Sequence, residues 1–232
     1  MRDKLYRIKG IILRRKGDIV SVLSPEGKMR LLAKGAGKPQ AKKTGHIETL
    51  SLSSLLILRG REMDIITQAE MLSGFEDIKE DPEKLYHALL MLELADRLFP
   101  EGEGGEFFEV LLTSLKALSS KRPEVVDIKF KIEALRFSGY MPELYKCPGC
   151  GKELREGFIG EDGIYCEGCG EGERLSREEI GALRFIEKTD IARLPDINDS
   201  LIEGIERFLD HEIKYVLEDE LKTQKFIRYL SP

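Results

Sequence analysis

The four cysteines of the chain form two Cys-x-x-Cys pairs, and this pattern constrains the fold more than any other feature. The first pair is Cys147 and Cys150, and the second pair, Cys166 and Cys169, follows after a spacer of fifteen residues. Two intervening residues allow both sulfurs of a pair to leave one tight turn and occupy adjacent corners of a tetrahedron around a metal. A glycine lies inside each pair and another follows it, where a tight turn needs positive φ or a close backbone approach. The spacing therefore predicts a four-thiolate zinc site.

Three other uses of the same cysteines are open at this point. Two disulfides would suit a secreted protein, but the N-terminal residues have no apolar core of a signal peptide. A redox dithiol needs only one pair, beside a βαβ unit. An iron–sulfur cluster also accepts four thiolates. We expect one zinc ion, because paired knuckle turns favour it, in a structural role, because four sulfur ligands leave no open position for a substrate.

The charge of the chain is unevenly distributed. The net charge is −5, but residues 1–46 contain thirteen basic and three acidic residues, so this segment carries +10 and the remainder −15. A basic first segment on an acidic chain suggests a surface that faces a polyanion. No apolar run reaches the roughly eighteen residues of a membrane span, so we expect no membrane association and a cytoplasmic location.

Short apolar runs separated by turn residues fill the first 71 residues, which is typical of β-strands. The predicted strands cover residues 6–14, 19–24, 28–34, 50–58 and 63–71. Five short strands in a segment of this length suggest a small closed barrel, and the OB-fold has the matching size. Such barrels bind single strands through basic grooves and aromatic platforms, but Tyr6 is the only aromatic residue before Phe75.

Eight basic residues of this segment are the candidate contacts for nucleic-acid phosphates: Arg14, Arg15, Lys16, Arg30, Lys34, Lys38, Lys42 and Lys43. Attraction to phosphate is independent of base sequence and falls with salt, so these residues predict affinity rather than specificity. The competing interpretation is a solvated lysine loop on an ordinary small barrel, which is the commonest meaning of a charge run.

From Asp81 onward the apolar residues recur at helical spacing. Asp81-Pro82-Glu83 is a typical helix start, and Ser176 with Glu179 forms a predicted capping box. The predicted helices cover about 81–98, 107–119, 123–138, 176–188 and 200–229. The first cysteine pair follows the third helix directly, so the four-cysteine segment is predicted to be an insertion between helices.

These patterns predict an α+β protein with several domains. The predicted parts are an OB-fold nucleic-acid-binding β-barrel at 1–79, an α-helical domain formed by 80–145 with 176–232, and an inserted zinc-binding lobe at 146–175. The chain shows no phosphate loop, dinucleotide fingerprint or nucleophile elbow, and its three histidines are scattered. We therefore expect a protein that is not an enzyme.

Several segments resemble the bacterial RecO family of recombination mediators and DNA-repair proteins, and they occur in that family's order. The approach to the cysteines, Gly139-Tyr140-Met141-Pro142 before Cys147, carries the most specific likeness. The other matching segments are residues 10–14, 27–36, 67–72, 132–138 and 220–226. Together they span nearly the whole chain.

The resemblance implies a function without a chemical step. RecO-like proteins bind single- and double-stranded DNA and anneal complementary strands. With RecR and RecF they help RecA replace single-strand binding protein on DNA. The resemblance also implies a structural zinc and a helical surface for the acidic tail of single-strand binding protein, for which Lys222, Lys225 and Arg228 are the candidate residues. The basic positions that match the family are Arg14, Arg30, Lys34, Lys38, Lys42 and Lys43.

Two other functions stay open. A helical protein-interaction scaffold stapled by zinc, without intrinsic DNA binding, is the alternative from another class. A nuclease that uses unrecognised carboxylates is the third. Steep salt dependence of DNA binding favours the mediator, and partner binding that survives neutralisation of the loop cations favours the scaffold. Cleavage that depends on a divalent metal would be required for the nuclease.

Overall fold

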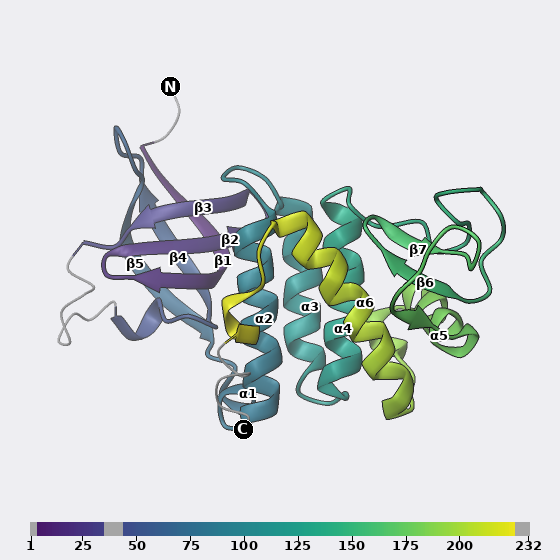
Figure 1. Ribbon diagram of the computed structural model, residues 1–232. Coiled ribbons are helices and arrows are strands. Elements are labelled where there is room, and N and C mark those ends of the chain that lie inside the picture. The colour runs from purple at the N-terminus through teal and green to yellow at the C-terminus, as the bar shows by residue number, and fades with distance from the viewer. Residues whose placement is uncertain (1–3, 35–43, 226–232) are drawn as a thin grey trace. The chain divides into compact units, whose positions relative to one another are not determined.

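The computed structural model describes residues 4–34 and 44–225, and its internal contacts divide the chain into two compact units (Figure 1). The first unit is Met1–Ser119 and the second is Ser120–Pro232. The boundary between these two units differs from the boundaries of the three domains predicted from the sequence. The three-domain division therefore stays a prediction. No helix within the described ranges has the length and apolar character needed to cross a membrane.

Five strands of the first unit form a closed barrel: β1 (Leu5–Lys16), β2 (Ile19–Ser24), β3 (Gly27–Leu32), β4 (Leu52–Leu58) and β5 (Ile65–Ser73). Their order is β1-β2-β3-β5-β4, with β3 parallel to β5 and β1 pairing antiparallel with β4 to close the ring. Alternate residues such as Ile12, Val22 and Ile57 fill the interior. The ring confirms the predicted barrel of the OB type.

The fourth strand begins at Leu52, slightly later than the predicted start at Leu50. β4 starts at Leu52, because Leu50 has a φ of 60°, which lies outside the extended region that a strand requires. The chain before Leu50 instead contains a short 3-10 helix, η1 (Thr44–His46). The hydroxyl of Ser53 donates to the carbonyl of His46 at 2.6 Å, which ties this segment to the start of β4.

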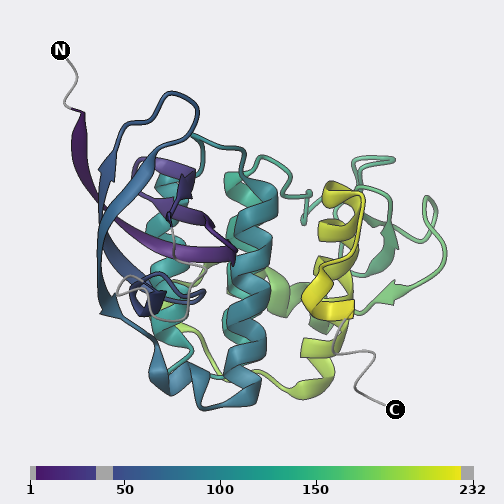
Figure 2. The same ribbon diagram turned by 90° about the vertical axis from the view of Figure 1, so that its left-hand side faces the viewer.

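The helices of the first unit are α1 (Glu76–Lys79), α2 (Pro82–Leu98), η2 (Gly105–Phe107) and α3 (Phe108–Ala117). α2 begins as predicted: the Asp81 side chain accepts hydrogen bonds from two backbone N–H groups, and Pro82 is the first helical residue. α2 contacts β1 and β2, and α3 contacts α2 and β1 (Figure 2). The outer face of β1 and β2 is therefore partly covered by α2.

The second unit contains α4 (Pro123–Phe137), α5 (Arg177–Lys188), η3 (Ile191–Arg193) and α6 (Asp199–Leu217), and α4, α5 and α6 all contact one another. α4 is buried on most sides, including its charged residues. The Lys131 ammonium lies 2.8 Å from Asp127 and 2.8 Å from Asp210. Burial opposes a charge on Lys131, but the two carboxylates outweigh it and raise the pKa of Lys131 above its ordinary value.

The predicted capping box of α5 is confirmed. The Ser176 hydroxyl accepts from the Glu179 N–H, and the Glu179 carboxylate accepts from the Ser176 N–H at 2.6 Å. The predicted helical segment at 200–229 is interrupted at Glu218, which takes a left-handed conformation with a φ of 53° and ends α6. The backbone is helical again at 222–225.

The segment between α4 and α5 forms the inserted lobe that carries the cysteines. Its three-stranded sheet, in the order β7-β6-β8, consists of β6 (Gly157–Gly160), β7 (Gly163–Tyr165) and β8 (Arg174–Leu175). Periodicity did not predict these strands, because they are too short to show an alternating pattern. Leu154 and Ile164 are fully buried and form the lobe's small apolar centre.

One carboxyl group of α6 is buried. Glu212 is 2% exposed, and burial together with the negative charge of Asp162, in the turn after β6, raises its pKa to about 8. The Nδ1 atom of His211 lies 3.5 Å from one Glu212 oxygen. Since a glutamate in an unfolded chain has a pKa of about 4.3, folding takes up a proton at Glu212 between these two values.

This raised pKa predicts that Glu212→Gln stabilises the protein more at high pH than at low pH. Proton binding by Glu212 makes its full contribution to the free energy of unfolding below about pH 4.3, and this contribution is lost as the pH rises through about 8. Glutamine stays neutral over the whole range. The advantage of the variant should grow over this window by at most about 1.4 kcal/mol per pH unit. The free energy of urea unfolding at several pH values measures it.

The matched control is Glu203→Gln, which neutralises an exposed carboxylate on the same helix. Its effect on the free energy of unfolding should be small and nearly independent of pH. A gain from Glu212→Gln that does not change with pH, or that equals the control, would contradict the assignment of a buried protonated carboxyl.

Candidate nucleic-acid surface and four-cysteine site

A β-bulge in β1 decides where the basic residues at its end point. Ile12 pairs with Val22 on β2, but Arg14 pairs with Ser21, so Leu13 is an extra residue in β1. A bulge of this kind reverses the alternation of side chains. Ile12 therefore lies in the barrel interior, while the Arg14 side chain lies outside and is 61% exposed.

The bulge separates the three consecutive basic residues into two groups. Arg14 and Lys16 lie on the outer face of the barrel. Arg15 pairs with Val20, whose side chain belongs to the barrel core, and its Nε atom donates to the Gly17 carbonyl at 3.3 Å. The structure thus brings Arg14 and Lys16 together but turns Arg15 away from them.

Arg14, Ser21 and Arg30 are direct cross-strand partners on β1, β2 and β3. Because neighbouring strands are about 4.8 Å apart, the backbones of the two arginines are about 10 Å apart with the serine between them. Together with Lys16 and Ile19 these residues line an open hollow of about 370 Å³, which we call the basic hollow. It unites three of the eight predicted phosphate contacts.

Two acidic residues contact the arginines of the basic hollow. The Asp96 carboxylate on α2 lies 3.1 Å from Arg14 Nε and accepts a hydrogen bond from the Ser21 hydroxyl at 2.6 Å. The Glu101 carboxylate, which follows α2, lies 3.4 Å from Arg30. Neither acid was predicted, because Asp96 lies 75 positions from Ser21 and Glu101 lies 71 positions from Arg30, and such distant contacts leave no local signal in a single sequence.

Of the four remaining predicted lysines, Lys34 falls within the described part of the chain. Lys34 is exposed after the end of β3, while Lys38, Lys42 and Lys43 lie outside the described residues. The single aromatic residue of the barrel segment, Tyr6, is engaged elsewhere. The Arg59 guanidinium lies 4.9 Å from the centre of its ring, and its hydroxyl donates to Asp64 at 2.6 Å. Within the described part of the barrel, no aromatic ring lines the basic hollow.

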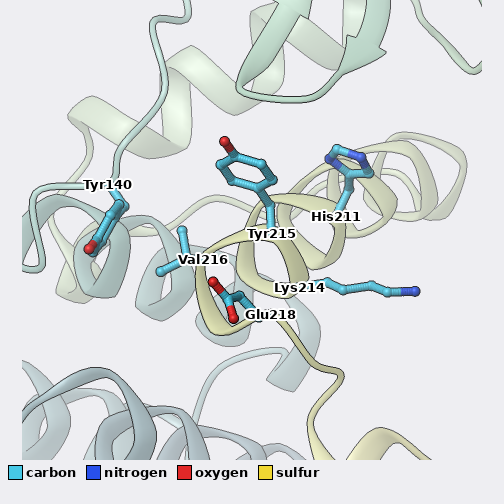
Figure 3. A pocket seen from close by; sticks show the side chains of 6 residues that line it. All are labelled: Tyr140, His211, Lys214, Tyr215, Val216 and Glu218. Carbon is cyan, nitrogen blue, oxygen red and sulfur yellow. The ribbon is translucent and has the colours of Figure 1, made fainter.

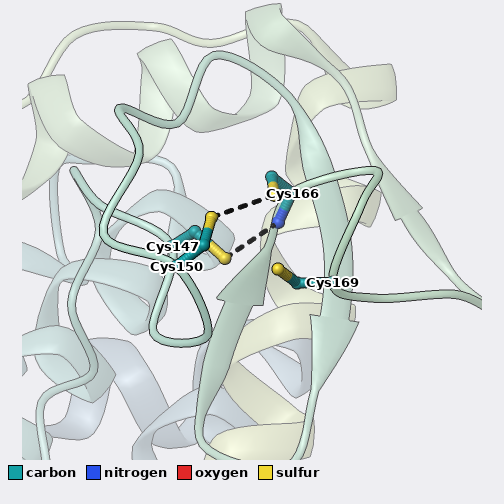
Figure 4. A group of neighbouring side chains, drawn as sticks. All are labelled: Cys147, Cys150, Cys166 and Cys169. Atoms are coloured by element: carbon teal, nitrogen blue, oxygen red, sulfur yellow. Dashed lines mark hydrogen bonds between the residues drawn. The ribbon is translucent and has the colours of Figure 1, made fainter.

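The four cysteines converge in the inserted lobe (Figure 4). Cys147 and Cys150 lie in the turn before β6, and Cys166 and Cys169 lie in the turn after β7. All four sulfurs lie within 4.8 Å of one another, and the sulfurs of Cys150 and Cys166 are 3.5 Å apart. A tetrahedral ion with bonds of about 2.3 Å requires sulfurs about 3.8 Å apart, so this cluster could hold a metal ion.

The thiols of the cluster are electrostatically unequal. Burial opposes ionisation of Cys147, but hydrogen bonds from the N–H groups of Cys166, Cys150 and Gly149 outweigh it and lower the pKa of Cys147 to about 6. The neighbouring thiols of Cys150 and Cys166 raise the pKa of Cys169 to about 12. Once the first thiol has lost its proton, further ionisation needs a positive charge, which a divalent metal supplies.

At three of the four glycines around the cysteines, the structure explains why glycine is favoured over a residue with a side chain. Gly151 has a φ of 70°. A Cβ on Gly149 would lie 3.2 Å from the Cys169 sulfur, and a Cβ on Gly170 would lie 2.5 Å from a tyrosine of β7. Gly168 has neither a positive φ nor a crowding neighbour. The predicted need for glycine is thus confirmed at the first turn and after the second one.

Arg184 of α5 attaches the lobe to the helices of its unit. Its Nε atom donates to the Leu144 carbonyl at 3.0 Å, and a terminal nitrogen donates to the Leu154 carbonyl at 2.9 Å. The guanidinium also lies 4.7 Å from the centre of the Tyr145 ring. These contacts hold the backbone on both sides of the first cysteine pair.

A second open hollow, of about 680 Å³, lies in the second unit between α6 and the turn after α4 (Figure 3). Its lining joins two exposed tyrosines to polar and basic side chains: Tyr140, His211, Lys214, Tyr215, Val216 and Glu218. We call it the tyrosine hollow. Of the previously predicted basic face, Lys225 pairs with Asp219 at 2.7 Å, and Arg228 lies outside the described residues.

A closed barrel of the OB type with a basic hollow is typical of nucleic-acid-binding proteins, and in this chain it precedes a helical unit with a four-cysteine lobe. Family models agree with this class. Residues 1–75 match the family described as Recombination protein O N terminal, and residues 79–225 match Recombination protein O C terminal. The chain belongs to the RecO family of DNA repair and recombination proteins.

Individual relatives match over nearly the full length. The DNA repair protein RecO of Desulforamulus reducens is 32% identical over 241 residues, covering 97% of this chain and 94% of the relative. The protein of the same name from Roseiflexus sp. is 30% identical, with 98% and 86% covered. That of Dehalococcoides mccartyi strain CBDB1 is 31% identical, with 94% and 93% covered. RecO proteins are recombination mediators rather than enzymes, which confirms the prediction of a non-enzymatic chain.

Proposed function

We propose that this protein binds single- and double-stranded DNA and anneals complementary strands in the cytoplasm. With RecR and RecF it would help to load RecA onto DNA covered by single-strand binding protein. Membership of the RecO family supports this function. The observation that carries the DNA-binding step is the basic hollow, where Arg14, Lys16 and Arg30 face outward together.

Annealing by such a surface needs no chemical step. Cations on one face lower the repulsion between two phosphate backbones, and base pairing supplies the remaining free energy. Because no aromatic ring of the described barrel lines the hollow, we infer that backbone phosphates rather than stacked bases supply the affinity. We propose that Lys34, Lys38, Lys42 and Lys43 also contribute phosphate contacts, and that Arg15 contributes less than its neighbours.

The basic hollow leads to a prediction about DNA affinity. Arg14→Gln with Lys16→Gln should weaken binding to labelled single-stranded DNA and make the plot of log affinity against log salt shallower, by about 0.7 for each phosphate contact that is lost. Changing Lys34, Lys38, Lys42 and Lys43 to Ala should have the same kind of effect. Fluorescence polarisation across a salt series measures both quantities.

Arg15→Gln is the matched control, because it removes the same charge from the same strand on the other face. It should leave the salt dependence close to that of the wild type. Equal losses from Arg15→Gln and Arg14→Gln would contradict the assignment of faces. A wild-type protein that does not bind DNA at low salt would contradict the DNA-binding function and favour the protein-interaction scaffold.

We infer that the metal of the cysteine cluster is one structural Zn²⁺, held by Cys147, Cys150, Cys166 and Cys169. The donor set fits, because four thiols whose sulfurs lie within 4.8 Å of one another are typical of structural zinc sites. When bound, the ion supplies positive charge that lets all four sulfurs ionise. The lobe has only a small apolar centre of its own, so cross-linking by metal would contribute much of its stability.

Cys147→Ser should therefore abolish stoichiometric zinc and lower the melting temperature of the second unit, while the barrel stays folded and binds DNA. Glu167→Gln is the matched control, because it changes an exposed side chain between two of the cysteines and should retain the metal. Metal analysis, circular dichroism melting and DNA binding measure these outcomes. Zinc content and melting identical to those of the wild type would refute the site.

We infer that the tyrosine hollow is the surface for the acidic tail of single-strand binding protein. Two exposed tyrosines, Tyr140 and Tyr215, offer ring faces for apolar side chains of a peptide, while Lys214 and His211 lie beside them for its carboxylates. Lys214 already pairs with Glu220 at 3.0 Å, which shows that its ammonium is accessible to a carboxylate.

Lys214→Glu should weaken binding of a labelled peptide with the sequence of that tail by about three- to tenfold, and the loss should shrink as salt rises. Arg193→Glu reverses an exposed charge elsewhere in the second unit and should leave peptide affinity nearly unchanged. Fluorescence polarisation of the peptide tests both variants. Equal losses in the two variants would indicate a general charge effect instead of a site.

A further inference from the structure

Glu101 and Asp96 play different roles beside the two arginines of the basic hollow. We propose that Glu101 is an exchangeable counter-ion of Arg30, which competes with DNA phosphates for that side chain, whereas Asp96 is a fixed positioning residue for Arg14. The inference rests on the proposed DNA binding of the basic hollow and names the residues that set its affinity.

The contacts of Asp96 are too closely interlocked for exchange. Its side chain is 13% exposed, and its two carboxylate oxygens serve Arg14 at 3.1 Å and the Ser21 hydroxyl at 2.6 Å. The Lys28 ammonium donates to the Asp96 backbone carbonyl at 2.6 Å and lies 3.8 Å from its carboxylate. Separating these groups would leave a largely buried carboxylate without partners, which is strongly unfavourable.

Arg14 can bind a phosphate while it keeps its contact with Asp96. The contact to Asp96 uses the Nε atom, and a guanidinium has four further N–H donors on its terminal nitrogens. The Arg14 side chain is 61% exposed and lines the basic hollow. Asp96 therefore holds Arg14 in a defined orientation while the terminal nitrogens stay accessible to a phosphate.

The pair of Arg30 and Glu101 has the opposite character. Both side chains are about half exposed, at 47% and 55%, and they share a single contact of 3.4 Å. Exposed ion pairs of this kind contribute little to stability. A phosphate offers two oxygens to the fork of a guanidinium, so it forms a stronger contact than this single one and can displace Glu101.

The backbone keeps Glu101 next to the hollow after displacement. The Gly102 N–H donates to the Lys28 carbonyl at 2.8 Å, and the Lys28 N–H donates to the Glu103 carbonyl at 2.7 Å, so this segment is tied to β3. A displaced Glu101 carboxylate thus stays near the bound phosphate and repels it. Glu101 therefore lowers the affinity for DNA and favours release of the strand.

The experiment measures binding of labelled single-stranded DNA to Glu101→Gln, Arg30→Gln and the double variant. Glu101→Gln should tighten binding by about two- to fivefold at low salt, with a gain that shrinks as salt rises. In the Arg30→Gln background the same change should lose most of its effect, because the competed side chain is absent. Glu103→Gln is the matched control, an exposed acid of the same segment for which the described structure shows no side-chain ion pair.

The possible outcomes separate this inference from the DNA-binding proposal. If Arg30→Gln weakens binding while Glu101→Gln leaves it unchanged, Glu101 is not a competitor, but the DNA surface stands. A gain in DNA affinity that persists in the Arg30→Gln background, or that Glu103→Gln reproduces, shows only the general electrostatic effect of removing a negative charge. That outcome also overturns the role of Glu101. If the wild type does not bind DNA at low salt, the DNA surface itself is refuted. Melting temperatures within a few degrees of the wild type establish that the variants are folded.

Discussion

Compensation of buried charge is the constraint on which both units depend. In the first unit, the largely buried Asp96 carboxylate joins α2 to β1 and β2 through Arg14 and Ser21. In the second unit, Lys131 of α4 lies between two carboxylates, one of them on α6. A buried charge without a partner would cost several kcal/mol, so these pairs restrict how each helix packs. The four-cysteine lobe extends the same requirement to thiolates, for which a metal is the natural counter-charge.

Periodicity and spacing predicted the elements that depend on local chemistry. The five strands, the helix start at Asp81 and the capping box at Ser176 follow from signals within a few residues. The four-cysteine cluster was equally accessible, because the turn geometry of a Cys-x-x-Cys pair is local and the chain has no other cysteines. The short strands of the lobe and the position at which α6 ends, Glu218, have no comparable signal in the sequence.

The basic hollow shows where prediction from one sequence stops. Arg14, Arg15 and Lys16 look equivalent in the sequence, yet the bulge at Leu13 places Arg15 on another face. Bulges arise from the register of a strand against its partner, which no local pattern records. The contacts of Asp96 and Glu101 depend on how α2 packs against the barrel, so these acids became apparent only with the tertiary structure.

The position of these acids bears on how a mediator works. A surface that carried only cations would bind any strand tightly and would slow its release. Annealing requires two strands to slide and exchange, so slow release would hinder it. The net charge of −5 and the carboxylates beside Arg14 and Arg30 limit that attraction. In the proposed DNA-binding role, one carboxylate would orient its arginine, and the other would compete with phosphate for Arg30. A hollow with both features would hold a strand briefly in a defined orientation, which is what the proposed annealing with a second strand requires.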